Sequence, residues 1–276
     1  METAGKIYNI LFVVSHPDDE AFWVGGLISE LARINFFNIY IICLSGGNSG
    51  AIRKNEFISA TKTAGLNNVY ISTEKLHLAE NPLPSITDTV RAGMVALSLK
   101  NADLDVLITH PPFGDEHGHP HHKQAYRELY IWTKHNDIPF GYFSTALIPY
   151  FDLRPTLTNM KRFGTLQLLN LSKCRNNVPW GLRIASKSLK DFHTPSYLLQ
   201  FLSSLDKKQT MLSHYLSIGL EKSAKGYCSF TNNCENLYLF DNRALAPFKI
   251  LIDKMETPGR PQLFPSRIKW LNKILK

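Results

Sequence analysis

The sequence predicts an α/β protein: a mostly parallel sheet with helices on both faces, followed by a C-terminal extension of mixed α and β structure. Short, continuous apolar runs alternate with segments whose apolar residues recur at helical spacing, and short connections join them. The 276 residues can bury a large core, so one α/β domain with additions is the default expectation. Polar loops follow the carboxyl ends of the predicted strands, which is where sheets of this kind bind ligands.

The alternation begins with the apolar run Ile10–Val14, which is typical of a buried strand. A helix start is expected directly after it. Ser15 can cap that helix, Pro17 fits its first turn, and the carboxylates of Asp18–Glu20 suit the positive end of its dipole. Apolar residues continue at helical spacing over Phe22–Ile34.

The same alternation continues through the first half of the chain. Further strands are expected over Phe36–Leu44, Val69–Ile71, Leu104–Thr109 and Tyr142–Ile148. Further helices are expected over Ile52–Leu66, Ser85–Leu99, His122–Lys134 and Ser203–Ile218. The segment from Pro149 to Gln200 loses the pattern and is assigned only as mixed strand and loop. We therefore divide the chain into a core over residues 1–150 and an extension over residues 151–276 that packs on it.

The formal net charge of +8 favours anionic partners, among them nucleic acid, anionic lipid and phosphorylated metabolites. Nucleic acid is not expected, because the chain has no nucleic-acid-binding motif and no long basic run before its last residues. Residues 266–276 form a basic amphipathic pattern with two interpretations. It is either a peripheral membrane contact or a helix packed on its own domain, and we prefer the second.

The chain is expected to be cytoplasmic. No apolar stretch approaches the roughly 20 residues of a membrane span, and the first residues lack the features of a signal peptide. The cysteines have no zinc-type spacing, and Cys43 lies in an apolar run, where a small buried thiol is expected. Disulfides are not expected.

His16 and Asp19 follow the first strand and are three residues apart, so a helical turn places them on one face. An imidazole and a carboxylate side by side at the carboxyl end of a strand are two thirds of a metal site. The alternative is an ordinary acidic helix start with one incidental histidine. This stretch alone does not decide between the two interpretations.

Four histidines lie within the six residues His117–His122, after another predicted strand, and His119 and His122 are again three apart. A polar loop that is merely rich in histidine, or one that binds a metal by itself, remains an alternative. One histidine of this loop would complete a set of two histidines and one carboxylate with His16 and Asp19. Such a set leaves a coordination position open, as catalytic zinc requires, and it also suits non-haem Fe(II).

A divalent ion at such a site would lower the pKa of a bound water and polarise a substrate carbonyl. Asp18 is next to Asp19 but points elsewhere, so it could take the proton of that water. A second histidine near the metal could protonate a leaving amine or stabilise the oxyanion. This inventory of residues fits metal-assisted hydrolysis of an amide or ester.

Two motifs are specific: His16-Pro17-Asp18-Asp19-Glu20 after the first strand, and the later His119-Pro120-His121-His122, preceded by Gly118. In these motifs the chain resembles the LmbE-like or PIG-L-like N-acetylglucosaminyl deacetylases. Weaker matches are Arg53 and Glu56, then Lys208, Leu212, Tyr215 and Ser217, and finally Cys234-Glu235 leading into Leu237.

The resemblance implies a Rossmann-like catalytic core, an extension that completes the substrate pocket, and zinc-dependent removal of acetate from an N-acetylglucosamine-type sugar. His16, Asp19 and His122 would bind zinc, with Fe2+ or another divalent ion as an alternative. Asp18 would be the general base, and His119 would stabilise the transition state and assist the leaving amine.

Three further residues are candidate substrate contacts under the resemblance: Arg53, His117 and His121. Arg53 is alternatively a solvated helix residue. His121 stands where the family often has Asp or Asn, and His117 stands where some members have tyrosine. Ile218 replaces the glutamine that usually follows the serine of the weaker C-terminal motif.

The leading hypothesis is therefore a de-N-acetylase of an N-acetylated sugar or glycoconjugate, and the charge and tail motivate a phosphorylated or lipid-linked one. The alternatives are another metal-dependent amidohydrolase of a glycoside metabolite and a non-catalytic sugar-binding protein of the same fold. Asp18 argues against the last, because a binding protein has no use for a base. The iron oxygenases share the ligand set but gain no other support. The sequence specifies neither the sugar nor the oligomeric state.

Overall fold

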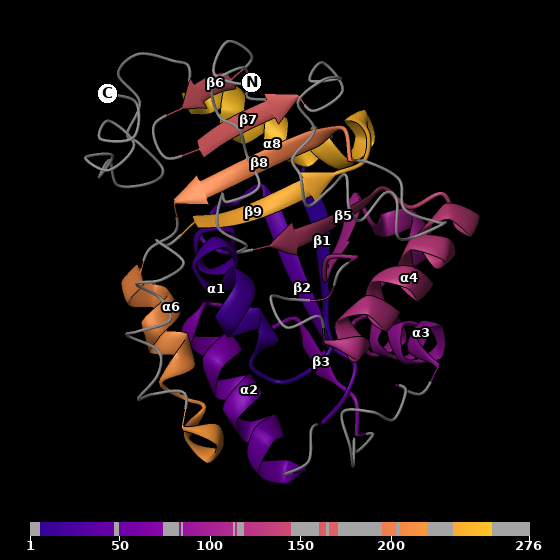
Figure 1. The fold of residues 1–276 in the computed structure, drawn as a ribbon, viewed down its shortest axis with the longest axis vertical. Helices are drawn as coiled ribbons and strands as arrows, with labels where there is room; N and C mark the ends of the chain where they lie inside the picture. Colours follow the sequence, from indigo (N-terminus) through magenta and orange to yellow (C-terminus); the bar gives the residue numbers. More distant parts are fainter. Residues whose placement is uncertain are drawn as a thin grey trace.

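The fold is built around one sheet of nine described strands in the order β3-β2-β1-β4-β5-β9-β8-β7-β6 (Figure 1). The structure is a computed structural model. The structure describes residues 6–46, 50–73, 83, 85–112, 114, 119–144, 160–163, 166–170, 195–202, 205–219 and 234–255.

The first five strands are parallel to one another, which confirms the predicted fold class. They are β1 (Tyr8–Val14), β2 (Phe37–Cys43), β3 (Val69–Ile71), β4 (Val106–Thr109) and β5 (Phe140–Ser144). The helices that connect them are α1 (Asp19–Leu31), α2 (Ala51–Thr63), α3 (Ile86–Ala96) and α4 (Pro120–His135), with a 3₁₀ turn, η1, over Asn101–Asp103.

Helices cover both faces of this parallel part. α1 and α2 pack on one face together with helices from the C-terminal part, whereas α3 and α4 pack on the other. Strand β1 contributes to both cores, because Ile10, Phe12 and Val14 face one layer while Leu11 and Val13 face the other. A strand buried on both faces reads as a continuous apolar run, which is why its sequence was predictive.

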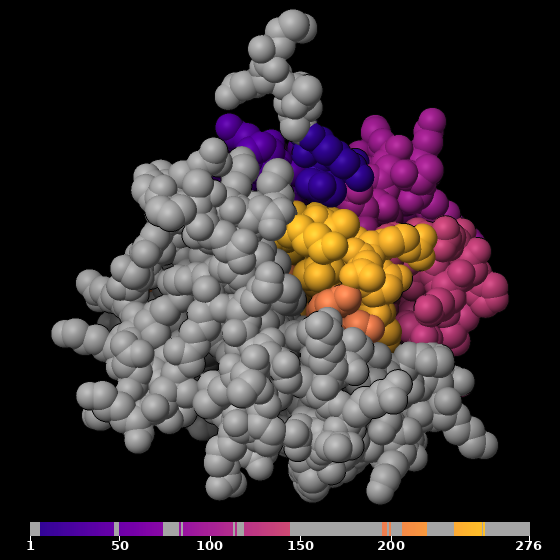
Figure 2. Space-filling view, turned by 90° about the horizontal axis from the view of Figure 1, so that it is seen from above, coloured from indigo at the N-terminus to yellow at the C-terminus, as the bar shows by residue number. Residues whose placement is uncertain are grey.

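The C-terminal part continues the same sheet in antiparallel fashion. β9 (Cys234–Leu239) pairs with β5, followed outward by β8 (Tyr197–Leu202), β7 (Leu166–Asn170) and β6 (Met160–Phe163). Its helices are α6 (Leu205–Leu212) and α8 (Asn242–Met255), with a 3₁₀ turn, η5, over Leu216–Ile218. Figure 2 shows the surface of this part directly against that of the N-terminal half. The division at residue 150 stays a prediction, since the sheet runs through both halves.

Two local predictions are wrong. The first helix begins at Asp19 rather than after a Ser15 cap, and the residue before it is Asp18. Ser15 instead uses its backbone N–H to donate to the ring of His110, so it belongs to the loop. The α-helix predicted over Ser203–Ile218 ends at Leu212, because a turn then brings Tyr215 into the same core, and only the 3₁₀ turn η5 follows.

One predicted helix cap is confirmed, and several predicted segments lie outside the described residues. The side chain of Ser85 caps α3 by accepting from the backbone N–H of Asp88 at 3.4 Å. Residues 145–148 of the predicted fifth strand, most of residues 149–200 and the amphipathic residues 266–276 lie outside the described residues. Among the helices that the structure describes, none has the length and apolar character needed to span a bilayer.

Candidate metal centre and active site

The predicted site residues meet at the carboxyl ends of the neighbouring parallel strands β1 and β4. His16, Asp18 and Asp19 come from the loop and first turn after β1, while His119 and His122 come from the start of α4. Residues about 100 positions apart in the sequence are thus side by side, as the predicted parallel sheet requires.

Asp19 is the centre of the cluster. Its Oδ1 lies 3.3 Å from His122 Nε2 and its Oδ2 lies 3.4 Å from His16 Nδ1. The two ring nitrogens, His122 Nε2 and His16 Nδ1, are 3.3 Å apart. A tetrahedral zinc site with bonds of about 2.0–2.1 Å places its ligand atoms roughly 3.3–3.4 Å from one another. The predicted set of two histidines and one carboxylate therefore fits a zinc ion.

A second group of three histidines, His16, His119 and His121, could also hold a metal. It would use the other nitrogen of His16, since His16 Nε2 lies 2.8 Å from His121 Nδ1. If the ion is bound by Asp19, this contact becomes a hydrogen bond that fixes the ring of His16. Histidine ligands commonly make such a bond with their second nitrogen.

The surroundings of Asp19 keep it ionised. It is buried and accepts hydrogen bonds from the backbone N–H of His16 at 2.8 Å and from Trp23 Nε1 at 3.1 Å. Burial by itself raises its pKa, but the neighbouring His122 holds the pKa of Asp19 well below its ordinary value. A carboxylate that is fixed and charged is what a metal ligand at this position needs.

Asp18 faces different partners. Its carboxylate lies 3.1 Å from Nη2 of Arg53, and the same guanidinium donates to the carbonyl of Pro17. Burial, and next the charge of Asp19, raise the pKa of Asp18 to about 7 against the opposing effect of Arg53. A carboxyl group that titrates near neutrality can both take up and release a proton, which suits a general base.

The backbone of Asp18 is strained. Its φ of 124° lies in the region that favours glycine, and such a conformation costs on the order of 1–3 kcal/mol in a residue with a side chain. This backbone conformation points the side chains of the adjacent Asp18 and Asp19 in different directions. As a result, Asp19 contacts the histidines while Asp18 contacts Arg53.

Glu20 lies behind Asp18 and is fully buried. One carboxylate oxygen accepts from the hydroxyl of Tyr215, and the other accepts from the backbone N–H of Asp18 at 3.1 Å. Burial raises the pKa of Glu20 to about 8, opposed by the hydrogen bond from Tyr215.

His119 is the residue before the first helical residue of α4, where its Nδ1 accepts from the backbone N–H of His121 at 3.3 Å. Pro120 follows at the first helical position, where its missing N–H costs nothing. The rings of His119 and His122 stack with their centres 4.6 Å apart. Burial, and next the nearby His122, lower the pKa of His119 to about 4. A neutral ring accepting at Nδ1 carries its proton on Nε2, so Nε2 is the ring nitrogen that can donate.

His110 is a site residue that sequence reasoning missed. It follows β4 directly and is buried, with its ring stacked on that of His122 at 3.8 Å. Its Nε2 accepts from the backbone N–H of Ser15 at 3.0 Å and lies 3.3 Å from Asp19 Oδ2. Burial, and then His122, lower the pKa of His110 to about 3, so the ring stays neutral. Its position immediately after a predicted strand was the signal that could have found it.

The candidate substrate contacts are placed as follows. Arg53 is only 8% exposed and lies over the ring of Tyr215, with its Cζ 5.7 Å from the ring centre. His121 is 2% exposed and contacts His16, as described above. His117 lies outside the described residues.

The weaker C-terminal motif holds helix α1 in place. Lys208 and Glu235 form a fully buried ion pair at 3.0 Å, and Glu235 also accepts from the backbone N–H groups of Gly26 and Leu27. α6 approaches α1 closely at Gly25, where a Cβ atom would come within 3.2 Å of Met211 Sδ. The C-terminal part thereby fixes the helix that carries Asp19.

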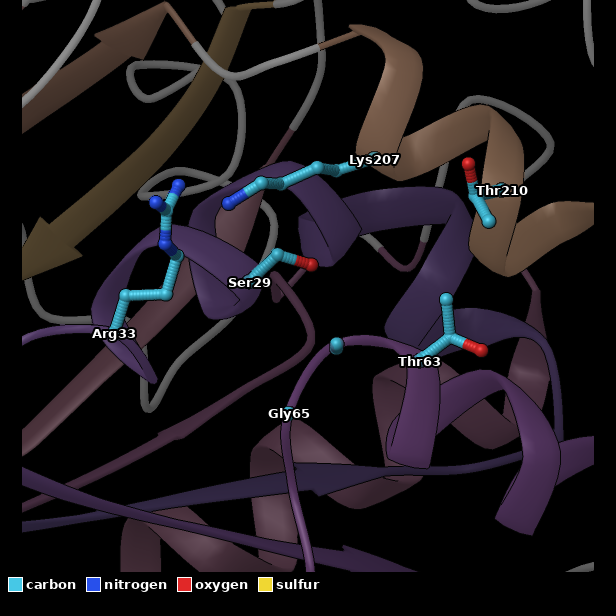
Figure 3. Close-up of a pocket in the computed structure, with 7 residues that line it drawn as sticks. Ser29, Arg33, Thr63, Gly65, Lys207 and Thr210 are labelled. Atoms are coloured by element: carbon cyan, nitrogen blue, oxygen red, sulfur yellow. The ribbon is translucent and has the colours of Figure 1, made fainter.

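A separate cavity of about 370 Å3 lies near the other end of α1, between α1, α2 and α6 (Figure 3). Its lining contains none of the predicted site residues. The residues that line it are Ser29, Arg33, Thr63, Ala64, Gly65, Lys207 and Thr210.

The fold and this cluster define a class: α/β proteins with a centre of two histidines and one carboxylate at the carboxyl edge of a parallel sheet. Residues 11–132 match the model of the family PIG-L, described as GlcNAc-PI de-N-acetylase. Over that stretch the chain is similar to the PIG-L/LmbE-like family, which confirms the resemblance.

Two curated relatives support the assignment. The chain is 28% identical over 125 residues to a probable N-acetylglucosaminyl-phosphatidylinositol de-N-acetylase of Schizosaccharomyces pombe, a match that covers 44% of this chain and 50% of the relative. It is 30% identical over 119 residues to a protein of the same name from Dictyostelium discoideum, covering 41% and 45% respectively. The chain thus spans about half the length of these relatives.

Among solved structures, a deacetylase–teicoplanin complex from the biosynthesis pathway of teicoplanin has a similar fold. The TM-score is 0.51 at 10% identity, with 84% of this chain and 97% of the other covered. At that identity the likeness shows the fold alone.

Proposed function

We propose that the chain is a zinc-dependent hydrolase that removes the acetyl group from an N-acetylglucosamine-type sugar. The observation that carries the proposal is the spacing of 3.3–3.4 Å among the ligand atoms of His16, Asp19 and His122, with the separately held Asp18 beside them. The PIG-L family match over residues 11–132 supports the substrate class. N-acetylglucosaminyl-phosphatidylinositol, named for both curated relatives, is the first substrate to test.

His16, Asp19 and His122 would hold the ion. When bound, a divalent ion polarises the acetamide carbonyl and makes a nearby water more acidic. The donor set of two imidazole nitrogens and a carboxylate oxygen favours zinc, while Fe2+ and other divalent ions use the same ligands.

Asp18 would take the proton of the attacking water as the water oxygen bonds to the carbonyl carbon. Its pKa near 7 allows the group to accept that proton and later release it. Asp18 is held by Arg53 rather than by the histidines, so it can act on the water without being a ligand.

His119 would stabilise the oxyanion through its ring N–H and assist the departing amine. The carbon–nitrogen bond then breaks, the amine nitrogen receives a proton, and the products are acetate and the free amino sugar. The ring of His119 contacts His16 edge to face and stacks on His122, and these contacts keep it at the cluster.

Arg53, His117 and His121 are proposed as substrate contacts. Arg53 Nη2 lies 3.1 Å from the carboxylate of Asp18, so a substrate contact there would lie beside the proposed base. The net charge of +8 supports an anionic aglycone such as a phosphoinositide. A cytoplasmic location and a membrane contact through residues 266–276 stay predictions.

The test is acetate release by the purified, zinc-loaded protein from N-acetylglucosaminyl-phosphatidylinositol and from a panel of free N-acetylated sugars. We expect turnover that a chelator abolishes and added zinc restores. Binding of these compounds without acetate release would contradict the proposal and favour a sugar-binding protein. Turnover that resists complete removal of metal would contradict its metal dependence.

A further inference from the structure

The hydroxyl of Tyr215 makes a buried contact with the loop that carries Asp18, although the two lie in opposite halves of the chain. Tyr215 follows α6, is fully buried and donates its hydroxyl proton to Glu20, 195 residues away in sequence. A hydrogen bond to a buried carboxyl is strong and fixes the orientation of the carboxyl plane. Tyr215 therefore sets the position of Glu20.

Glu20 in turn holds the backbone of Asp18. The oxygen of Glu20 that does not contact Tyr215 accepts from the N–H of Asp18 at 3.1 Å. This bond acts on the residue whose φ of 124° is strained, and a strained conformation persists only where its surroundings impose it. The geometry thus forms a continuous connection from Tyr215 through Glu20 to Asp18.

Helix α2 supports the same connection from a second side. Glu56 accepts from the backbone N–H of Ser217 at 2.7 Å and from its hydroxyl at 2.6 Å, which anchors the segment after Tyr215. One turn earlier, Arg53 lies over the ring of Tyr215 and binds the carboxylate of Asp18 at 3.1 Å. Tyr215 therefore contacts both groups that hold Asp18: Glu20 at its backbone and Arg53 at its side chain.

We propose that Tyr215 is a positioning residue for the base, acting through Glu20 to hold Asp18 in its productive orientation. The inference rests on the proposed function, in which Asp18 takes the proton of the attacking water. It explains why this tyrosine carries a hydroxyl at a fully buried position, where phenylalanine would fill the same space.

The first experiment compares Tyr215→Phe with wild type, both loaded with zinc, on N-acetylglucosaminyl-phosphatidylinositol. Small displacements of a reacting group cost up to about a hundredfold in rate, so we expect kcat to fall about 10- to 100-fold. KM should change less than about threefold and bound zinc per chain should not change, because no proposed ligand is altered. An unchanged kcat in an active assay would overturn the inference.

The matched control is Tyr142→Phe, which removes the same atom from another buried tyrosine. Among the described residues the hydroxyl of Tyr142 has no hydrogen-bond partner, and its ring packs in the core on the other face of the sheet. We expect its kcat to stay within about twofold of wild type. An equal loss in both variants would show a general effect of removing buried hydroxyls and would overturn the inference.

A double-mutant cycle of Tyr215→Phe and Glu20→Gln tests whether Tyr215 acts through Glu20 or whether the two residues affect kcat independently. The amide of glutamine cannot accept from both Tyr215 and Asp18 in the way that the carboxyl oxygens do, so Glu20→Gln should reproduce the loss in kcat. The double variant should lose no more than the larger single loss. Losses that multiply would overturn the inference while leaving the proposed function intact. Absence of turnover in wild type would instead remove the proposed function, and this inference with it.

Discussion

Each end of helix α1 has a buried glutamate, and the two carboxyl groups have different partners. Near the C-terminal end, Glu30 is paired with Lys207 at 3.1 Å and is within 4.0 Å of Arg33, and these two cations line the cavity of Figure 3. Near the N-terminal end, Glu20 is buried without an ion pair in the described part of the chain, and burial raises its pKa to about 8.

The difference shows how one helix serves both stability and chemistry. A buried charge with cations beside it is the ordinary structural solution, and it is found at the end remote from the site. A buried carboxyl with a raised pKa and a strained neighbour is typical of functional sites. Variants near each end of α1 should therefore differ: those at the N-terminal end should affect catalysis, and those at the C-terminal end should affect stability only.

The largest effect is expected for His122→Ala, which removes a proposed ligand. Bound zinc should fall from about one ion per chain to near zero, and acetate release should drop at least about a hundredfold. Metal content by emission spectroscopy and the deacetylation assay measure both. His135→Ala, at the exposed far end of α4, is the control and should change neither. Full zinc content in His122→Ala would show that the third ligand is wrongly assigned.

The next effect is expected for Asp18→Ala and Asp18→Asn, which remove the base but no ligand. Turnover should fall about 10²- to 10⁴-fold, the usual contribution of a positioned base, while zinc content stays unchanged. Asp88→Asn, in the first turn of α3, is a control of the same residue type. Unchanged turnover would remove Asp18 from its role, and loss of zinc would show that it is a ligand instead.

The smallest effect on chemistry is expected at two adjacent lysines of α6. Lys208→Met breaks a fully buried pair with Glu235 and should destabilise the fold by roughly 3–5 kcal/mol. Lys207→Met removes a lysine that is 29% exposed from the pair with Glu30, and Arg33 stays within 4.0 Å of Glu30, so this change should cost less than about 1 kcal/mol. Thermal unfolding measures both, and kcat of the folded Lys207 variant should match wild type. A larger loss of stability for Lys207→Met would reverse the comparison.

The sequence predicted the parallel half of the fold because its strands are buried on both faces and read as apolar runs. It also placed His16, Asp19 and one histidine of the segment His117–His122 together, because both segments follow the carboxyl ends of strands in the same parallel sheet, whereas the choice of His122 came from the resemblance. These inferences depend only on local pattern and on the geometry of parallel sheets.

The rest of the site depends on contacts that local pattern does not contain. His110 is a single histidine after a strand, with no nearby partner whose spacing would mark it. The contact between Tyr215 and Glu20 joins residues 195 positions apart, and only the fold brings them together. Ser15 was expected to cap a helix, but its N–H is used by His110 and the helix begins after the strained Asp18.

The central claim is that His16, Asp19 and His122 hold the ion and leave Asp18 free. The most direct test is a crystal structure of the zinc-loaded protein with anomalous diffraction measured at the zinc absorption edge. We predict a single peak among His16 Nδ1, the carboxylate of Asp19 and His122 Nε2, with Asp18 not coordinating. A peak among His16 Nε2, His119 and His121, the competing group of histidines, would contradict the claim.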